Sequence, residues 1–145
     1  MNDTIPETAR LTADVVLFGE RDGQLYVLMI RRGWDPFAGH LALPGGHVDV
    51  SEDTQDAAYR ELAEETGLHL GVLEYVGVYS TPGRDPRGRY VTFAYTAMLT
   101  HTPEPTAGDD ATAAEWVLVD KALATATELA FDHKQIIHDA LRVAL

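Results

Sequence analysis

The sequence contains no cysteine. This absence excludes disulfides, zinc–thiolate sites, iron–sulfur clusters and thiol nucleophiles, and it is consistent with a reducing compartment. No apolar run approaches the length needed to span a bilayer. The N-terminus, MNDTIPETARL, also lacks the basic segment followed by an apolar stretch that marks a secretory signal. We therefore expect a cytoplasmic protein.

Basic residues are scarce, with 11 Lys and Arg against 23 Asp and Glu, for a formal net charge of −12. A field of this sign repels a nucleic-acid backbone and an anionic membrane, so we expect neither as a partner. A small anionic substrate is still compatible with the charge, because metal cations can lie between carboxylates and phosphate oxygens. A solvated acidic surface accounts for the rest of the charge.

The chain shows no repeat, low-complexity tract or interdomain linker within its 145 residues, of which 46% are hydrophobic. This size suits one domain with a real core, and we expect a single domain over residues 1–145. Segments rich in β-formers predict strands at 13–18, 25–31, 41–43, 71–80, 90–100 and 115–119. Asp22 and Gly23 predict a hairpin turn between the first two, and Pro44, Gly45 and Gly46 are predicted to end the third.

Helices are expected at 51–66, after Asp120, and from Asp132 to the end of the chain. Ser51, Asp120 and Asp132 are the predicted N-caps, and Gly67 is placed to end the first helix in the left-handed conformation. Strands interrupted by a central helix and followed by helices predict an α/β fold, with a mixed sheet between helical layers.

Three glutamates, Glu61, Glu64 and Glu65, are spaced i, i+3 and i+4 on the central helix. This spacing places their carboxylates within an arc of about 100° on one face. Like charges so placed repel one another, and Arg60 is the cation available nearby. Hard divalent cations, Mg²⁺ above all, hold such clusters of oxygen ligands. From these residues alone, a solvated acidic face is an equally good explanation.

The neighbouring residues extend this cluster into a longer pattern. Gly45 and Gly46 allow a tight turn and a close approach to a ligand. Residues 46–68 read G-x5-E-x7-R-E-L-x-E-E-x-G-L, and they match the signature box of the Nudix hydrolases at all nine defined positions. The resemblance extends from the first strand to the final helix. It implies the Nudix α/β/α sandwich and hydrolysis of a nucleoside diphosphate linked to another moiety.

The resemblance also implies roles for individual residues. Glu61, Glu64 and Glu65 would be catalytic metal ligands, with the backbone carbonyl of Gly45 as a further ligand. The expected metal is Mg²⁺, with Mn²⁺ as a possible substitute. Arg60 and Glu52 would orient the carboxylates through ion pairs and hydrogen bonds.

Two residues are candidates for the general base that takes a proton from the attacking water. One is Glu65 within the box. The other is Glu115, which precedes Trp116 in a late strand, at a place that resembles where some family members carry an extra catalytic glutamate. An exposed residue at a strand edge is the alternative interpretation of Glu115.

The segment from Ser80 to Tyr90 carries three arginines, Arg84, Arg87 and Arg89, in an otherwise acidic chain. We expect them to bind phosphate or a terminal ribose, since guanidinium groups grip phosphate in a bidentate fork. A solvated turn is the alternative. This loop, the stretch RRGWDPFAGHLALPGG and the late Phe131-Asp132-His133 resemble the ADP-ribose pyrophosphatase branch of the family, whose products are AMP and ribose 5-phosphate.

Several further residues are candidate substrate contacts. Trp34, Phe37, Tyr90 and Phe131 could stack on an adenine base, although aromatic residues near strand ends commonly pack in the core or at its rim. His133 could contact the substrate from the start of the final helix, or serve as a surface or capping residue.

Two other functions are considered beside ADP-ribose hydrolysis. A sanitising hydrolase of nucleoside triphosphates would instead produce a monophosphate and pyrophosphate. A non-catalytic ADP-ribose sensor, like the Nudix-like domains of some transcriptional regulators, is less expected, because the box carries every carboxylate and 145 residues leave little room for a DNA-binding module. A homodimer is expected from the resemblance alone.

Overall fold

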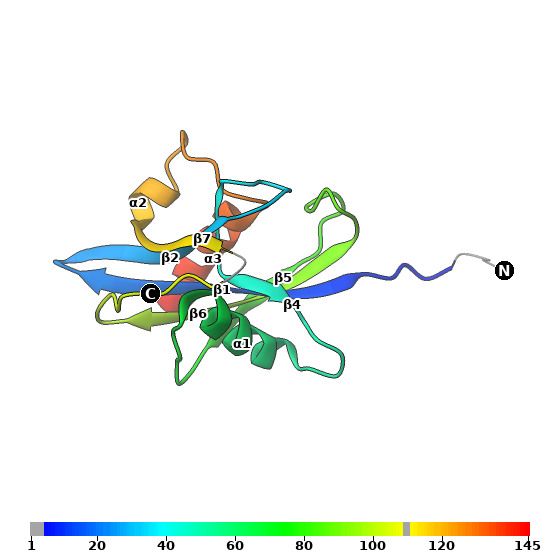
Figure 1. Ribbon diagram of the computed structural model, residues 1–145, viewed down its shortest axis with the longest axis horizontal. Helices are drawn as coiled ribbons and strands as arrows, with labels where there is room; N and C mark the ends of the chain where they lie inside the picture. Colours follow the sequence, from blue (N-terminus) through cyan, green and yellow to red (C-terminus); the bar gives the residue numbers. More distant parts are fainter. Residues whose placement is uncertain (1–4, 109–110) are drawn as a thin grey trace.

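A computed structural model describes residues 5–108 and 111–145. One seven-stranded mixed sheet is covered by helices on both faces (Figure 1), which confirms the expected α/β sandwich. The strands are β1 (Arg10–Arg21), β2 (Gln24–Arg32), β3 (Leu41–Ala42), β4 (Gly45–His47), β5 (Glu74–Tyr79), β6 (Tyr90–Leu99) and β7 (Ala111–Leu118). The helices are α1 (Thr54–Thr66), α2 (Val119–Ala122) and α3 (His133–Ala144).

The central strand β1 is buried on both faces, which explains its continuous apolar run. Alternate side chains of β1 enter two different cores. Val16 and Phe18 pack with residues of α2 and α3. Ala13, Val15 and Leu17 pack with residues of α1. The two helical layers in Figure 1 are therefore held by opposite faces of the same strand.

The sheet splits beside β1, and the split creates the site. The β1–β2 register runs from Phe18↔Val27 to the hairpin turn, so the two strands pair only near their connection. Farther along, β4 pairs with β1 at Thr12 to Asp14, and β3 pairs with β2 at Ile30 and Arg31. The parallel strand β6 lies along the other side of β1. The chain between β3 and β4 thus crosses a gap in the middle of the sheet.

One predicted hairpin turn and one predicted helix end are confirmed. Asp22 and Gly23 have φ values of 53° and 76°, the two positive angles that a tight hairpin between twisted strands requires. Gly67 ends α1 with φ 73°, and its N–H donates to the Ala63 carbonyl. Both positions reflect local backbone geometry, which is why the sequence alone indicates them.

Three predicted caps are wrong in position or in role. Asp53, and not Ser51, is the N-cap of α1, and its carboxylate accepts from the Gln55 N–H. Asp120 lies inside the first turn of α2, whose N-cap is Leu118. Asp132 is the N-cap residue of α3 by position, but its side chain makes no capping hydrogen bond. Its carboxylate instead accepts hydrogen bonds from Arg84.

Two predicted strand boundaries also need correction. The predicted turn at Gly45 and Gly46 is instead the short strand β4. β7 begins at Ala111, four positions before the expected start at Glu115. In both cases a long-range strand partner, and not the local sequence, sets the conformation.

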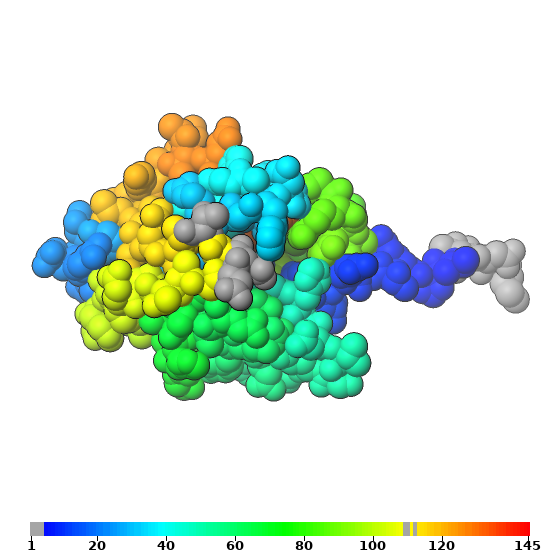
Figure 2. All heavy atoms as spheres, in the orientation of Figure 1, coloured from blue at the N-terminus to red at the C-terminus, as the bar shows by residue number. Residues whose placement is uncertain are grey.

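Residues 5–9 project from the body of the molecule ahead of β1 (Figure 2). None of the helices that the structure describes has the length and apolar character of a membrane-spanning segment.

Candidate active site

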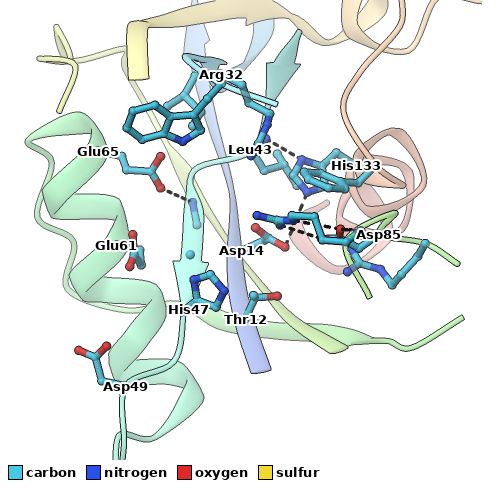
Figure 3. Close-up of a pocket in the computed structure, with 17 residues that line it drawn as sticks. Thr12, Asp14, Arg32, Leu43, His47, Asp49, Glu61, Glu65, Asp85 and His133 are labelled. Carbon is cyan, nitrogen blue, oxygen red and sulfur yellow. Dashed lines mark hydrogen bonds and ion pairs between the residues drawn. The ribbon is translucent and has the colours of Figure 1, made fainter. Parts of the chain in front are cut away.

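A cleft of ≈ 250 Å³ opens where the sheet splits. One wall carries Asp49, Glu61 and Glu65, on α1 and the segment leading to it (Figure 3). Other parts of the cleft are lined by three arginines, Arg32, Arg84 and Arg87. Asp14, Asp85 and His133 also line it. The strand β4 runs between the acidic wall and Asp14 (Figure 3). The site therefore joins residues from β1, β2, β4, α1, the 80–90 loop and the start of α3.

Two glycines of β4 make room for carboxylates. A Cβ on Gly46 would lie 2.5 Å from the carboxylate carbon of Glu61, and a Cβ on Gly45 would overlap Asp14 and the backbone of Ala13. The Gly45 N–H donates to Glu65 Oε1 at 2.7 Å. These glycines are therefore needed for close approach of side chains and not for a turn.

Arg60 ties the acidic residues of α1 to the loop before it. Its guanidinium donates to Glu52 at 2.8 and 2.9 Å, to Glu61 at 2.8 Å and to the His47 carbonyl at 2.8 Å. It also pairs with Glu64 at 3.2 Å. The hydrogen bond from Arg60 lowers the pKa of the Glu52 carboxyl to about 2. The predicted contacts of Arg60 with Glu52 and the box carboxylates are present, and their role in orienting metal ligands stays a prediction.

Two predicted catalytic glutamates lie away from the cleft lining. The Glu64 side chain is 57% exposed and faces Arg60. Glu115 lies in the middle of β7 and pairs with Arg31 at 3.4 Å. Neither is among the described residues that line the cleft. Their catalytic roles stay predictions.

The donor set of the acidic wall fits a hard divalent cation. Glu61 and Glu65 both line the cleft beside the Gly45–Gly46 backbone, and the missing Cβ of Gly46 leaves space against the Glu61 carboxylate. Within residues 5–108 and 111–145, no three His, Asp or Glu side chains are arranged around one metal position. Mg²⁺ does not require three, because it typically takes one or two carboxylates and completes its shell with water and substrate phosphate.

Two arginines of the cleft, Arg84 and Arg87, are each held by a carboxylate partner. Arg84 donates to both oxygens of Asp132, at 2.9 and 2.6 Å. Arg87 grips the buried Asp85 in the same way, at 3.1 and 2.7 Å. Desolvation opposes the charge on Arg84, but its hydrogen bonds to Asp132 outweigh this and raise its pKa. Both guanidinium groups are thus pre-positioned cations in the cleft.

Arg32 is the third cation of the cleft. Its Nε donates to the Pro36 carbonyl at 2.7 Å, and its guanidinium lies 5.0 Å from the centre of the Phe131 ring. Burial, reinforced by the nearby charge of Arg87, lowers the pKa of Arg32. A bound anion would relieve the repulsion between these two arginines.

The remaining predicted substrate contacts divide into two groups. Trp34, which is 59% exposed, lines the cleft together with Phe131 and His133. Phe37 packs edge-on against Phe131, with ring centres 4.9 Å apart, and is not part of the described lining. Arg89 donates to the Ser80 carbonyl and pairs with Glu7 at 3.2 Å, beside a separate shallow hollow. The structure therefore brings Arg84 and Arg87 to the cleft, but not Arg89.

Sequence reasoning did not single out six polar residues of the lining: Thr12, Asp14, Arg32, His47, Asp49 and Asp85. Asp14 carried a usable signal, because it is a charged residue at the start of an apolar strand. Asp85 also carried one, lying between two arginines of the same loop. Arg32 and Asp49 lie inside the segments that carry the family resemblance. Thr12 and His47 have no local signal, because only the pairing of β1 with β4 brings them together.

The chain is similar to known proteins along most of its length. Residues 8–140 match the model of the NUDIX domain family. The chain is 42% identical over 123 residues to an ADP-ribose pyrophosphatase of Methanocaldococcus jannaschii, covering 85% of this chain and 69% of that protein. It is 36% identical over 132 residues to the ADPR responsive transcriptional repressor NtrR of Acinetobacter baylyi, covering 90% of this chain but only 52% of the repressor.

A solved structure is also similar over most of its length. The NUDIX domain of Shewanella oneidensis NrtR, determined in complex with ADP ribose, superimposes with a TM-score of 0.87 at 33% identity. The superposition covers 97% of this chain and 94% of that domain. The family match, the spacing of the box and the cleft beside α1 together show that this chain belongs to the NUDIX family and is a Nudix hydrolase.

Proposed function

We propose that this protein hydrolyses the diphosphate linkage of nucleoside diphosphate derivatives, with ADP-ribose as the preferred substrate and AMP and ribose 5-phosphate as products. The proposed cofactor is Mg²⁺, with Mn²⁺ as a substitute. The similarity to an ADP-ribose pyrophosphatase and to a domain solved with ADP ribose supports this choice of substrate.

One observation carries the proposal: a single cleft is lined by acidic residues of α1 on one side and by held arginines elsewhere. A diphosphate is strongly anionic, so it would be repelled by Glu61 and Glu65 alone. The arginines Arg84 and Arg87 provide fixed positive charge within reach of the same space. This combination suits a ligand whose phosphates meet the acidic wall through a cation and whose other parts meet the arginines.

Different residues would bind the cation, accept a proton and orient the substrate. Glu61, Glu64, Glu65 and the Gly45 carbonyl would hold the cation, which when bound supplies charge neutralisation and a more acidic water. Arg60 keeps Glu61 oriented through its 2.8 Å hydrogen bond. Glu65, which is 6% exposed, is the proposed acceptor of the proton from the attacking water. Arg84 and Arg87 would orient the diphosphate group of the substrate through their guanidinium groups.

The test is a substrate screen with product identification. Purified protein is incubated with Mg²⁺ and ADP-ribose, with other nucleoside diphosphate sugars and with nucleoside triphosphates. We expect the highest kcat/KM for ADP-ribose, equal amounts of AMP and ribose 5-phosphate, and no turnover in excess EDTA. A tenfold preference for a triphosphate, with release of pyrophosphate, would instead assign a sanitising hydrolase.

A second candidate function is an ADP-ribose sensor. It is favoured by the similarity to the Acinetobacter repressor and to the NrtR domain. The two functions differ in one measurement, because a sensor binds ADP-ribose without consuming it. Tight binding with no product after prolonged incubation with Mg²⁺ or Mn²⁺ would favour the sensor.

A further inference from the structure

A buried carboxylate and a buried imidazole lie next to each other in the cleft, and neither has a role in the proposed hydrolysis. Asp14 comes from β1 and His133 from the first turn of α3. Their side chains are only 10% and 5% exposed, yet both line the cleft. Thr92 Oγ1 donates to Asp14 Oδ2 at 2.6 Å, which holds the carboxylate in place.

The tautomer of His133 is set by the backbone. The Leu43 N–H donates to His133 Nδ1 at 2.9 Å, so Nδ1 carries no proton and the neutral ring carries its proton on Nε2. Burial lowers the pKa of His133 and thus favours this neutral form. The Nε2–H group is therefore a fixed donor.

This donor lacks a protein acceptor at bonding distance among the described residues. His133 Nε2 lies 3.8 Å from Asp14 Oδ2, which is too long for a hydrogen bond. Among residues 5–108 and 111–145, the Leu43 N–H is the one group that forms a hydrogen bond with the His133 ring. The ring of His133 is almost fully buried and lines the cleft, and its Nε2 lies beside the Asp14 carboxylate (Figure 3).

A hydroxyl group satisfies both neighbours at once, because it can accept from Nε2–H and donate to the carboxylate. An ionised phosphate oxygen cannot do so, since it has no proton to donate and is repelled by Asp14. The edge of a nucleobase also carries donors and acceptors, but its flat face needs an aromatic or apolar surface to stack on. The exposed Trp34 ring offers a flat apolar surface elsewhere in the same cleft.

We propose that Asp14 and His133 form a hydroxyl-recognition subsite that binds a sugar hydroxyl on the non-nucleoside half of a nucleoside diphosphate sugar. The inference rests on the proposed function, because it presumes such a substrate in this cleft. It assigns substrate discrimination to two residues outside the signature box. Both are specificity determinants, since neither has a part in the proposed attack on phosphorus.

Binding calorimetry with three ligands tests the subsite. The ligands are ADP-ribose, the tetrahydrofurfuryl ester of ADP, which keeps the terminal ring but lacks its hydroxyls, and ADP-ribose made with 2′-deoxyadenosine. Ca²⁺ replaces Mg²⁺ to neutralise the phosphates, and the ligands are checked for cleavage afterwards. We expect wild type to bind the ester about 10- to 100-fold more weakly than ADP-ribose, and the deoxyadenosine analogue nearly as well as ADP-ribose.

Two variants and one control test whether Asp14 and His133 cause the preference for ADP-ribose over the ester. Asp14→Asn removes the charge and exchanges one accepting oxygen for an NH2 group that cannot accept. His133→Asn keeps an acceptor for the Leu43 N–H while losing the Nε2 donor. Each is expected to remove most of the preference for ADP-ribose over the ester, with binding of the ester itself retained within about threefold. Asp139→Asn is the matched control, because Asp139 also accepts from a hydroxyl, Tyr79 at 2.7 Å, but does not line the cleft.

The outcomes separate this inference from the proposed function. Equal binding of ADP-ribose and the ester by wild type overturns the subsite, as does an equal loss for both ligands in the variants, which indicates a structural role. A large loss with the deoxyadenosine analogue alone would place the nucleoside ribose there and also overturn it. Hydrolysis by wild type with Mg²⁺ is scored separately, so a preference for hydroxyls without turnover refutes only the proposed reaction.

Discussion

At the scale of single residues, β4 shows why two adjacent glycines are required. Successive side-chain positions of a strand point to opposite sides, and here each side holds a carboxylate, Asp14 beside Gly45 and Glu61 beside Gly46. The glycine pair thus separates a proposed metal-binding wall from a proposed hydroxyl subsite. An added methyl group would overlap backbone atoms at Gly45 but only a side-chain end at Gly46. The two substitutions should therefore differ in their effect on stability.

We predict that Gly46→Ala lowers kcat by at least about tenfold with little loss of stability, because the group it displaces is the end of the Glu61 side chain. Gly45→Ala meets the Ala13 backbone as well as Asp14, and should cost about 1–3 kcal/mol of stability. Gly71→Ala, where nothing lies within 4 Å of the added Cβ, is the control. Urea unfolding and initial rates of the three variants check this; equal unfolding midpoints for all three would contradict it.

The carboxylates of the box give a second prediction at this scale. Glu64→Gln and Glu65→Gln keep the side-chain shape but remove the charge, so each should lower kcat by several orders of magnitude if both residues hold the cation. The apo fold should be unaffected, because removing one of several like charges relieves repulsion on α1. Asp56→Asn, in the first turn of the same helix, is the matched control. Turnover at the wild-type level in both variants would remove the box from the mechanism.

At the scale of secondary-structure elements, α1 is fastened to the loop before it through one arginine. Arg60 contacts Glu52, Glu61, Glu64 and the His47 carbonyl. The helix carrying the carboxylates and the strand carrying the glycines are thereby held in register. A lysine cannot reproduce this, since a point charge lacks the planar set of donors of the guanidinium group.

The pairing of Glu52 with Arg60 predicts a dependence of stability on pH. The folded-state pKa of Glu52 is about 2, below its ordinary value of 4.5. A depressed carboxyl pKa stabilises the fold above the unfolded-state value, and this stabilisation is lost as pH falls from 4.5 toward 2. The stability difference between wild type and Glu52→Gln should therefore shrink over this range. Denaturant titrations at a series of pH values measure it, with Glu20→Gln at the exposed end of β1 as control.

At the scale of the whole molecule, the net charge of −12 and the acidic wall act together. Excess like charge destabilises a compact state, and a ligand that binds only the folded state stabilises it by mass action. Divalent cations should therefore raise the melting temperature more than NaCl of equal ionic strength does.

We predict that this cation-specific increase in Tm is lost in the double variant Glu61→Gln and Glu65→Gln and kept in Asp120→Asn, an exposed carboxylate of α2. Differential scanning calorimetry with MgCl2, MnCl2 and NaCl provides the readout without any substrate. The prediction fails if the double variant responds to Mg²⁺ as strongly as wild type, because the stabilising ions would then bind elsewhere on the acidic surface.

The sequence by itself determined the features that depend on short separations along the chain. The shared helix face of Glu61, Glu64 and Glu65 follows from their spacing and the helical repeat. The turn at Asp22 and Gly23 follows from local backbone angles. The nine positions of the box are likewise a local pattern, so the family and the acidic wall could be predicted. The contacts of Arg60 could be predicted for the same reason, because its partners on α1 and in the preceding loop are close to it in sequence.

Only the tertiary structure decided which distant residues share the cleft. Asp14 and His133 lie side by side because β1 and α3 both border the split in the sheet. Arg84 donates to Asp132, which is 48 positions away in the sequence. The pairing of β4 with β1 turned Gly45 and Gly46 from an expected turn into a strand. Arg89 lies outside the cleft, where its carbonyl accepts from the Arg10 N–H at the start of β1. Such contacts depend on strand register and on how layers pack, which no local spacing encodes.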